Sequence, residues 1–257
     1  MKKQTNTFKC SSHWLASRIH VTLVGAGGTG SNTLDALCQL HHGLLAVGHP
    51  AGLHVTVFDE DVVDLPNIGR QRFIYSDIGS NKATTLVNRY NLAYGLEWES
   101  RPVHFEAKSI KHHTPEILIT CVDTISTRKD IANVMGKHKN SNSDDMWLDF
   151  GNSRHTGQVI LGHLMNNKNR LPNVYDLYSE LEVLEEDNEP SCSLAEAIQT
   201  QDLYINRCLA DAGVNILWQL LRTGEIDHHG AFINLKTSEV KPLKINEAVW
   251  EFMGYAA

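Results

Sequence analysis

The segment 19–40 constrains the fold more than any other part of the chain. Ile19–Val24 (IHVTLV) has the apolar and β-branched residues of a buried strand and runs directly into the sequence GAGGTG. Ser31–Leu40 follows, with leucines at helical spacing. In such a unit the glycines permit a tight turn, and the free N–H groups of the helix N-terminus bind phosphate. We therefore predict a nucleotide-binding α/β unit, with a tight turn that binds no ligand as the alternative. The glycines predicted to contact nucleotide are Gly25, Gly27, Gly28 and Gly30.

Val55–Gln71 (VTVFDEDVVDLPNIGRQ) joins a second strand to a group of polar side chains. Two carboxylates, Asp59 and Asp61, end the strand, and an amide, a guanidinium and a second amide follow at Asn67, Arg70 and Gln71. Carboxylates suit ribose hydroxyls and a fixed cation suits phosphate, so this order predicts a nucleotide site. We expect His41–Leu53 to be a loop. It places Asp59 further from the glycines than the roughly 20 residues usual in dinucleotide-binding proteins, which disfavours a plain NAD dehydrogenase.

Three more charged residues extend this set. Lys82 stands in the linker before a helix predicted from Ala83 to about Ala93. Asp123 ends the apolar run Glu116–Asp123 (EILITCVD), and ligands of open α/β sheets bind at the carboxyl ends of strands. Arg128 lies in the first turn of a helix predicted over 126–135. A cation there opposes the helix dipole, so we expect a phosphate or a carboxylate beside it, or else a solvent-exposed arginine.

The second half of the chain changes its pattern. Before this change, Val103–Lys108 alternates like a strand and Glu116–Asp123 is the fourth strand of the predicted parallel sheet. Short turns then join strands at 146–150 and 157–164, with a final hairpin at 231–235 and 239–245. Strands joined in this way predict antiparallel pairing. The fold class is thus α/β: a Rossmann-like mixed sheet, parallel in its N-terminal half and antiparallel in its C-terminal half, with helices on both faces. We divide the chain into an N-terminal arm (1–18), one domain (19–246) and a C-terminal tail (247–257).

Composition excludes several classes. The net charge of −7 over 257 residues argues against broad nucleic-acid binding. No apolar run approaches the roughly 20 residues of a membrane span, and no apolar segment follows the basic N-terminus as in a signal peptide. We expect a cytoplasmic protein with no membrane association. The five cysteines are odd in number and form no CxxC pair, which indicates reduced thiols and gives no zinc signature.

Taken together, the motifs resemble the ubiquitin-activating (E1-like) superfamily, which includes the sulfur-carrier adenylyltransferases ThiF and MoeB. The resemblance covers about 19–245 and rests on GxGGxG, DxD, N-x-x-R-Q, a lysine, and a strand-terminal aspartate followed five residues later by arginine. Gly157–Val159 (GQV) is similar to the first strand after the family's nucleotide half. The segment PSCSLAEAIQTQDLYIN at 190–206 is most similar to the ThiF-family protein of bacterial PRTRC cassettes.

The resemblance implies that ATP adenylates the C-terminal glycine carboxylate of a small ubiquitin-like (β-grasp) carrier protein and releases pyrophosphate. Asp59 would bind ribose, Asp61 would shape the site or hold Mg²⁺, and Asp123 would hold Mg²⁺ near the reacting centre. The phosphates would be surrounded by Asn67, Arg70, Gln71 and Lys82, and Arg128 belongs to the same nucleotide-binding set. The residues implied in catalysis are Arg70, Lys82, Asp123 and Cys192. A general base is unnecessary because the carboxylate is ionised at neutral pH.

Three departures from the family pattern matter. The zinc-binding CxxC pairs are absent, so we expect no structural zinc. No arginine stands where the family often lends one from the partner subunit, and Lys2 or Lys3 is the substitute we consider. Cys192 lies in a long crossing loop before a helix, a setting that favours thiolate, so it is either the thioester cysteine or a buried structural cysteine. Cys121 and Cys208 fall in a strand and a helix and are expected in the core.

Alternatives stay open at this point. An NAD(P)-dependent oxidoreductase would use GxGxxG and Asp59 equally, but it has no need of N-x-x-R-Q and Lys82. An adenylating relative could act on a peptide, a small carboxylate or a tRNA base, and a non-catalytic scaffold could retain the fold. Family members are usually homodimers, and the apolar helical region 194–221 is where we expect such an interface.

Overall fold

The computed structural model describes residues 6–111, 115–136, 144–165, 170–178 and 201–255. Its centre is an eight-stranded mixed sheet in the order β10-β9-β7-β6-β5-β2-β3-β4. The strands β4, β3, β2, β5 and β6 are parallel, and β7, β9 and β10 are antiparallel to their neighbours. The bounds are β2 Ile19–Val24, β3 Leu53–Phe58, β4 Glu99–Arg101, β5 Ile117–Thr120, β6 Met146–Asn152, β7 Thr156–His163, β9 His228–Asn234 and β10 Glu239–Lys244. The predicted fold class is confirmed.

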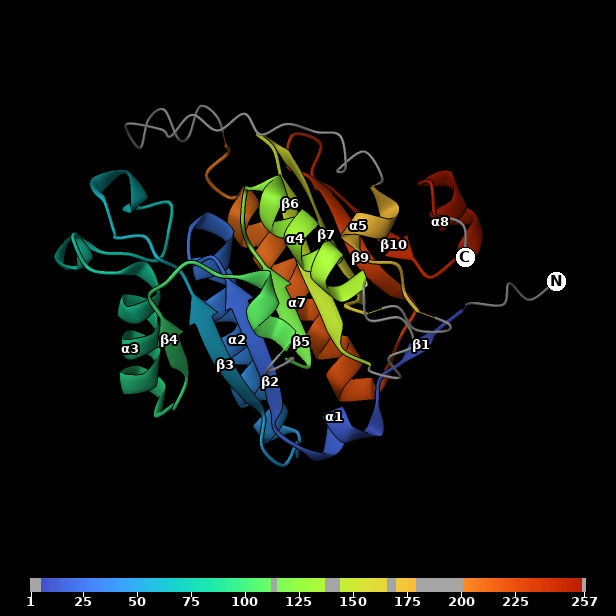
Figure 1. Ribbon diagram of the computed structural model, residues 1–257, viewed down its shortest axis with the longest axis horizontal. Coiled ribbons are helices and arrows are strands. Elements are labelled where there is room, and N and C mark those ends of the chain that lie inside the picture. The colour runs from blue at the N-terminus through green and yellow to red at the C-terminus, as the bar shows by residue number, and fades with distance from the viewer. Residues whose placement is uncertain (1–5, 112–114, 137–143, 166–169, 179–200, 256–257) are drawn as a thin grey trace.

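Helices cover both faces of this sheet (Figure 1). The long helices α2 and α7 pack against each other behind the sheet, and α4 lies in front of it. The α-helices are α1 Ser12–Ala16, α2 Gly28–Ala46, α3 Lys82–Tyr94, α4 Ile125–Gly136, α5 Val174–Leu177, α7 Ile205–Thr223 and α8 Glu247–Phe252. Among the described residues, 3₁₀ turns lie at η1 Leu65–Asn67, η2 Tyr75–Asp77 and η3 Ala107–Lys111.

The central strands are buried because helices cover both of their faces. β5 is buried at all four positions, and Val21, Leu23, Val55 and Val57 of the neighbouring strands are at most 2% exposed. β2 pairs in parallel with β3 on one side and β5 on the other. This arrangement gathers the carboxyl ends of three strands at one edge of the sheet, where the loops carry the predicted polar residues.

Several expectations about individual elements were wrong. Val103–Lys108 is not a strand: β4 precedes it, and the alternation arises because Phe105 and Ala107 pack into the core from a segment that leads into η3. His41–Leu53 is not wholly a loop, since α2 continues to Ala46. The segment 1–18 is not merely an irregular arm, because Trp14 of α1 is buried and β1 (Phe8–Lys9) pairs with β8 (Glu225–Ile226).

In the described part of the region 194–221, the apolar residues pack inside the subunit. The buried residues of α7 pack against α2 and the strands β6, β7 and β9. This accounts for its apolar residues without a subunit interface. In the part of the chain that the structure describes, no helix is both long and apolar enough to cross a membrane.

Candidate nucleotide site

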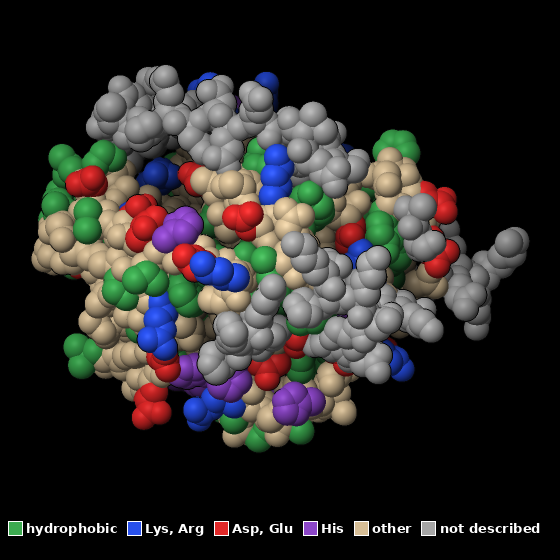
Figure 2. All heavy atoms as spheres, in the orientation of Figure 1, with side chains coloured by type: hydrophobic (Ala, Val, Ile, Leu, Met, Phe, Trp, Pro, Cys, Tyr) green, Lys and Arg blue, Asp and Glu red, His purple; other side chains and the backbone are tan. Residues whose placement is uncertain are grey.

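A cleft of ≈ 1090 Å³ opens at the carboxyl edge of the parallel strands. Figure 2 shows it as a hollow with basic side chains inside and acidic side chains at its rim. Most of the predicted site residues line it: Gly25, Gly27, Gly28, Asp59, Asp61, Asn67, Arg70, Gln71, Lys82, Asp123 and Arg128. Gly30 lies behind the lining, and Cys192 lies outside the described residues. Segments far apart in the sequence therefore meet in one cavity.

The glycine loop can form only because two of its positions lack a side chain. Gly25 has φ +89°, which is the left-handed region, and its N–H donates to the carbonyl of Phe58 at 2.9 Å. A Cβ on Gly30 would stand 1.8 Å from the carbonyl oxygen of Gly25. The first turn of α2 thus packs directly on the loop that precedes it, and its N-terminal N–H groups are presented to the cleft.

Asp59 ties the glycine loop to the end of β3. Its Oδ2 accepts the backbone N–H of Ala26 at 2.6 Å, and its Oδ1 accepts the N–H of Asp61 at 2.9 Å. Burial raises the pKa of Asp59, and the bond from Ala26 opposes that rise. A carboxylate has lone pairs beyond these two bonds, so the predicted contact with ribose hydroxyls is chemically compatible with this geometry.

Lys82 meets Asp61 in an ion pair, with Nζ 2.8 Å from Oδ2. Asn81 sets this pairing, because its Oδ1 caps α3 at the N–H of Thr84 while its Nδ2 donates to the carbonyls of Asp59 and Asp61. Asn81 was not among the residues predicted from the sequence, although asparagine directly before a helix is a strong capping signal. It fixes the end of β3 against the start of α3.

Arg70 and Gln71 carry buried polar atoms that the described chain leaves without a partner. These are Nε of Arg70 and Oε1 of Gln71. Burial lowers the pKa of the Arg70 guanidinium, and the Asp123 carboxylate opposes that shift. Buried polar groups are nearly always hydrogen-bonded in native proteins, so unpartnered ones in a cleft are a mark of a ligand site.

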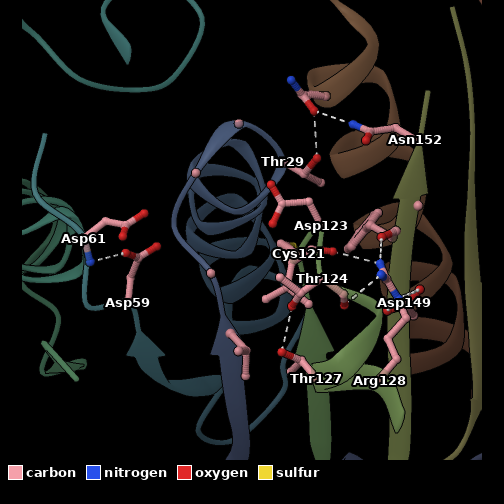
Figure 3. A pocket seen from close by; sticks show the side chains of 18 of the residues that line it. Thr29, Asp59, Asp61, Cys121, Asp123, Thr124, Thr127, Arg128, Asp149 and Asn152 are labelled. Carbon is pink, nitrogen blue, oxygen red and sulfur yellow. Dashed lines mark hydrogen bonds and ion pairs between the residues drawn. The ribbon is translucent and has the colours of Figure 1, made fainter. Parts of the chain in front are cut away.

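Arg128 lines the cleft and is bonded within the chain. It is 7% exposed, so the solvent-exposed alternative is wrong, and the carboxylate beside it is Asp149, 2.9 Å from its Nε. Nη2 donates to the carbonyls of Val122 and Phe150 at 2.9 and 2.7 Å, and Nη1 donates to that of Thr124. All three nitrogens thus bond within the chain. Arg128 braces the loop that carries Asp123, as Figure 3 shows for Arg128, Asp149 and Thr124.

A polar group at the start of α7 was likewise not predicted from the sequence. Asn206 is 1% exposed, and its Oδ1 accepts the Thr29 hydroxyl at 2.8 Å and the Asn152 amide at 2.7 Å. Figure 3 shows Thr29 and Asn152 directed toward this same side chain. Nδ2 of Asn206 donates to Oε1 of Gln201 at 2.9 Å, and Nη1 of Arg70 donates to that same oxygen at 3.1 Å. No local motif marks these residues, because their partners are distant in the sequence.

The carboxylates in the cleft indicate which metal ion it could hold. Asp123 is an exposed carboxylate in the cleft lining. Mg²⁺ at nucleotide sites typically takes one or two protein carboxylates together with substrate phosphates, so one such residue fits it. Among the residues that the structure describes, no group of three or more His, Cys, Asp or Glu side chains could hold a metal by itself. The expectation that structural zinc is absent stays a prediction.

Comparison with known families decides the class of the chain. The ThiF family model matches residues 8–248. The chain belongs to the ThiF family. This membership agrees with the order of motifs along the sequence and with the position of the cleft at the carboxyl edge of the sheet. A comparison with curated proteins gives no match.

Solved structures of several proteins share this fold. They include E. coli MccB with MccA-N7isoASN (13% identity, TM-score 0.59, 89% of this chain and 65% of that chain). E. coli MccB with ATP gives 12% identity, a TM-score of 0.59, and coverage of 91% and 65%. PaaA gives 14% identity, a TM-score of 0.56, and coverage of 88% and 64%. The chain therefore spans about two thirds of the length of these proteins, 64–65%.

Proposed function

We propose that this ThiF-family protein is an E1-like adenylyltransferase. A carboxylate oxygen of the substrate attacks the α-phosphorus of ATP, the bond from that phosphorus to the bridging oxygen breaks, and pyrophosphate leaves with its electron pair. The products are an acyl adenylate and pyrophosphate. The substrate we propose is the C-terminal glycine of a small ubiquitin-like carrier protein, as the resemblance of the motifs to the E1-like superfamily implies.

The observation that carries this proposal is that the cleft lined by the glycine loop also holds two buried polar atoms without a partner, Nε of Arg70 and Oε1 of Gln71. A Cβ on Gly28 would lie 3.2 Å from Nη1 of Arg70, so the guanidinium stands against the loop whose N–H groups suit phosphate. Attack by an anion on a polyphosphate is opposed by charge. Preorganised cations that neutralise the developing charge are commonly the largest catalytic contribution at such a site.

Each residue then has a defined task. Arg70 and Lys82 neutralise the phosphates, and Asn67 and Gln71 offer amide contacts beside them. Asp59 holds the ribose while it keeps Ala26 of the glycine loop in place. Arg128 supports the site through its bonds to the carbonyls of Val122 and Thr124, on both sides of Asp123.

Magnesium belongs to the proposal through Asp123. Asp61 is the weaker candidate ligand, because its carboxylate is already paired with Lys82. Bound Mg²⁺ would neutralise phosphate charge and orient the leaving group. The Asp123 carboxylate also opposes the lowering of the Arg70 pKa by burial, so it favours the charged guanidinium.

The partners are proposals of the same kind. We propose a cytoplasmic homodimer whose second-half edge is open to a second copy: among the described residues β10 pairs only with β9, and most of its side chains are exposed. Gel filtration at dilute concentration that returned only monomer would count against the dimer. We also propose a thioester on Cys192. A Cys192→Ala variant should then form the adenylate and lose any reducible adduct with the carrier.

Calorimetric titration is the first test, with ATP and Mg²⁺, with NAD in parallel, on the unchanged chain and on Arg70→Ala. Binding of ATP that weakens in the variant, with no response to NAD, supports the proposal. ATP–pyrophosphate exchange in the presence of a recombinant β-grasp protein ending in Gly-Gly then tests the reaction. Exchange with a short peptide instead would move the substrate to the peptide class. ATP binding without exchange on any carboxylate would favour a nucleotide-binding scaffold, and NAD binding would favour an oxidoreductase.

A further inference from the structure

A chain of side-chain hydrogen bonds connects the start of α7 to Arg70, and its direction is fixed. Arginine can only donate, so Gln201 must turn its oxygen toward Nη1 of Arg70. Asn206 must then turn its amide nitrogen toward that oxygen. Its own oxygen is left to accept the Thr29 hydroxyl and the Asn152 amide. Only one orientation of the Gln201 and Asn206 amides satisfies all of these hydrogen bonds. The hydrogen-bond network therefore fixes Oε1 of Gln201 toward Arg70.

The anchors of this chain are rigid parts of the site. Thr29 is in the first turn of α2, between Gly28 and Gly30 of the glycine motif, and Asn152 ends β6. Asn206 is buried between them at the start of α7. The position of the Gln201 acceptor is therefore fixed relative to the glycine loop, although Gln201 precedes α7 and lies 131 residues after Arg70.

A carboxylate in the cleft also attracts the Arg70 guanidinium and competes with its bond to Gln201. Asp123 lies within electrostatic reach of its guanidinium, and Nε of Arg70 has no partner that would hold it otherwise. The bond from Nη1 to Gln201 keeps the guanidinium against Gly28 rather than drawn toward the carboxylate. A guanidinium fixed over the loop meets phosphate without a rearrangement, and such preorganisation raises affinity.

We propose that Gln201 and Asn206 are positioning residues for Arg70, which hold its guanidinium over the glycine loop and so set the affinity of the cleft for the phosphates of ATP. The proposal rests on the proposed function, since it presumes that ATP is the ligand. It assigns the start of α7 a role in nucleotide binding.

The decisive variant is Gln201→Met, which keeps the length of the side chain and removes the acceptor. Hydrogen bonds to charged groups are strong enough that its loss should weaken ATP binding about tenfold. Adenosine, which has no phosphate, should bind both proteins equally. A general disturbance of the cleft would weaken adenosine as well. Gln219→Met, on the helix α7 that follows Gln201 and outside the cleft lining, is the matched control and should bind ATP like the unchanged chain.

A double-mutant cycle with Arg70→Ala shows whether Gln201 acts through the arginine. In the Arg70→Ala background, Gln201→Met should cause no further loss of ATP affinity. Asn206→Asp supplies an independent break, because it preserves the acceptors for Thr29 and Asn152 but presents an oxygen to Gln201 and forces the glutamine amide to turn. Part of its effect is direct repulsion of phosphate, which persists without Arg70. The remainder should vanish in the Arg70→Ala background.

The outcomes separate this inference from the proposed function. ATP binding that Arg70→Ala weakens but Gln201→Met leaves intact overturns the positioning role alone. A loss that Gln201→Met causes equally with and without Arg70 also overturns it. Failure of the unchanged chain to bind ATP overturns the proposed function, and this inference with it.

Discussion

Buried polar side chains in the antiparallel half of the sheet are paired within the chain, whereas those beside the carboxyl edge of the parallel half are not all paired. His229 bonds the carbonyl of Leu161 through Nδ1 and accepts the Trp250 indole N–H at Nε2, at 2.7 and 2.8 Å. His163 accepts the N–H of Leu171 at 2.9 Å. By contrast, the described residues hold three buried side-chain nitrogen or oxygen atoms without a partner, and all lie in the segment 70–72.

This difference indicates that buried polar groups serve stability in the antiparallel half of the sheet and ligand binding at the carboxyl edge of the parallel half. A paired buried group contributes to stability, while an unpaired one costs free energy unless a ligand satisfies it. The antiparallel half is therefore where substitutions should cost stability, whereas Arg70 and Gln71, which line the cleft, are where they should cost binding. Arg128 and Asp149 are the intermediate case, because a fully paired buried group supports the loop of the ligand site.

Arg128→Ala should give the largest effect on stability. The substitution leaves Asp149, whose side chain is 1% exposed, buried without its cation. Removing one partner of a buried ion pair typically costs about 3–5 kcal/mol. Chemical denaturation measures the loss. Arg207→Ala, which removes the exposed pair with Asp211 on α7, is the control and should change the free energy of unfolding by less than about 1 kcal/mol.

The pH dependence of this variant sharpens the comparison. Burial raises the pKa of Asp149, and Arg128 opposes that rise. Without Arg128 the folded-state pKa rises further above the unfolded value, so protonation favours the folded state and the deficit should shrink as pH falls. A deficit that stays constant between neutral and acidic pH would mean that lost packing, rather than the uncompensated charge, explains the destabilisation.

Arg70→Ala should weaken ATP binding without lowering the free energy of unfolding, in contrast to the loss of stability expected for Arg128→Ala. We expect ATP affinity to fall about tenfold to a hundredfold, as for the loss of hydrogen bonds to a charged group. The free energy of unfolding should stay the same or rise, because the substitution removes a desolvated guanidinium with an unpartnered Nε. Arg72 is the matched comparison: it pairs with Asp35 at 2.8 Å and does not line the cleft. Arg72→Ala that weakened ATP binding as much as Arg70→Ala would remove the distinction.

Local patterns predicted the parallel half of the sheet well because its strands are apolar and the candidate carboxylates follow them directly. Asp59 and Asp123 come after buried strands, and the carboxyl ends of parallel strands must meet. Arg128 was predicted beside a phosphate or a carboxylate, or else exposed, and the identity of the carboxylate depends on how β5 and β6 pair. Gln201 and Asn206 could not be predicted, since their partners lie up to 177 residues away. Val103–Lys108 was wrongly predicted to be a strand, because residues of a segment can alternate in burial without pairing to a neighbouring strand.

Acid should destabilise the antiparallel half by an intermediate amount. Burial lowers the pKa of His163 and of His229 from 6.5 to about 4. A histidine with a lowered folded pKa contributes stability above its unfolded pKa, and this stability is lost as pH falls toward the folded pKa. At pH 5 linkage gives a loss of about 2 kcal/mol for each histidine.

Denaturation at pH 7.5 and pH 5 measures this loss, and His229→Gln should reduce it because glutamine keeps a donor and an acceptor but does not titrate. His228→Gln, on the same strand, is the control for a change of histidine number. An acid-induced loss that His229→Gln leaves unchanged would show that the buried histidine is not its source.

Asp61→Asn should give the smallest effect. It tests directly whether the ion pair between Asp61 and Lys82 competes with ligand binding. Asp61 is 63% exposed in its side chain, so its ion pair with Lys82 should contribute less than about 1 kcal/mol to stability. Substitution frees Lys82 and removes a negative charge from the rim of the cleft, so ATP affinity should rise by about two- to fivefold, the equivalent of an exposed pair. The rise should be the same with and without Mg²⁺. If affinity instead falls, and only when Mg²⁺ is present, then Asp61 is a magnesium ligand and its pairing with Lys82 is what ATP and Mg²⁺ displace.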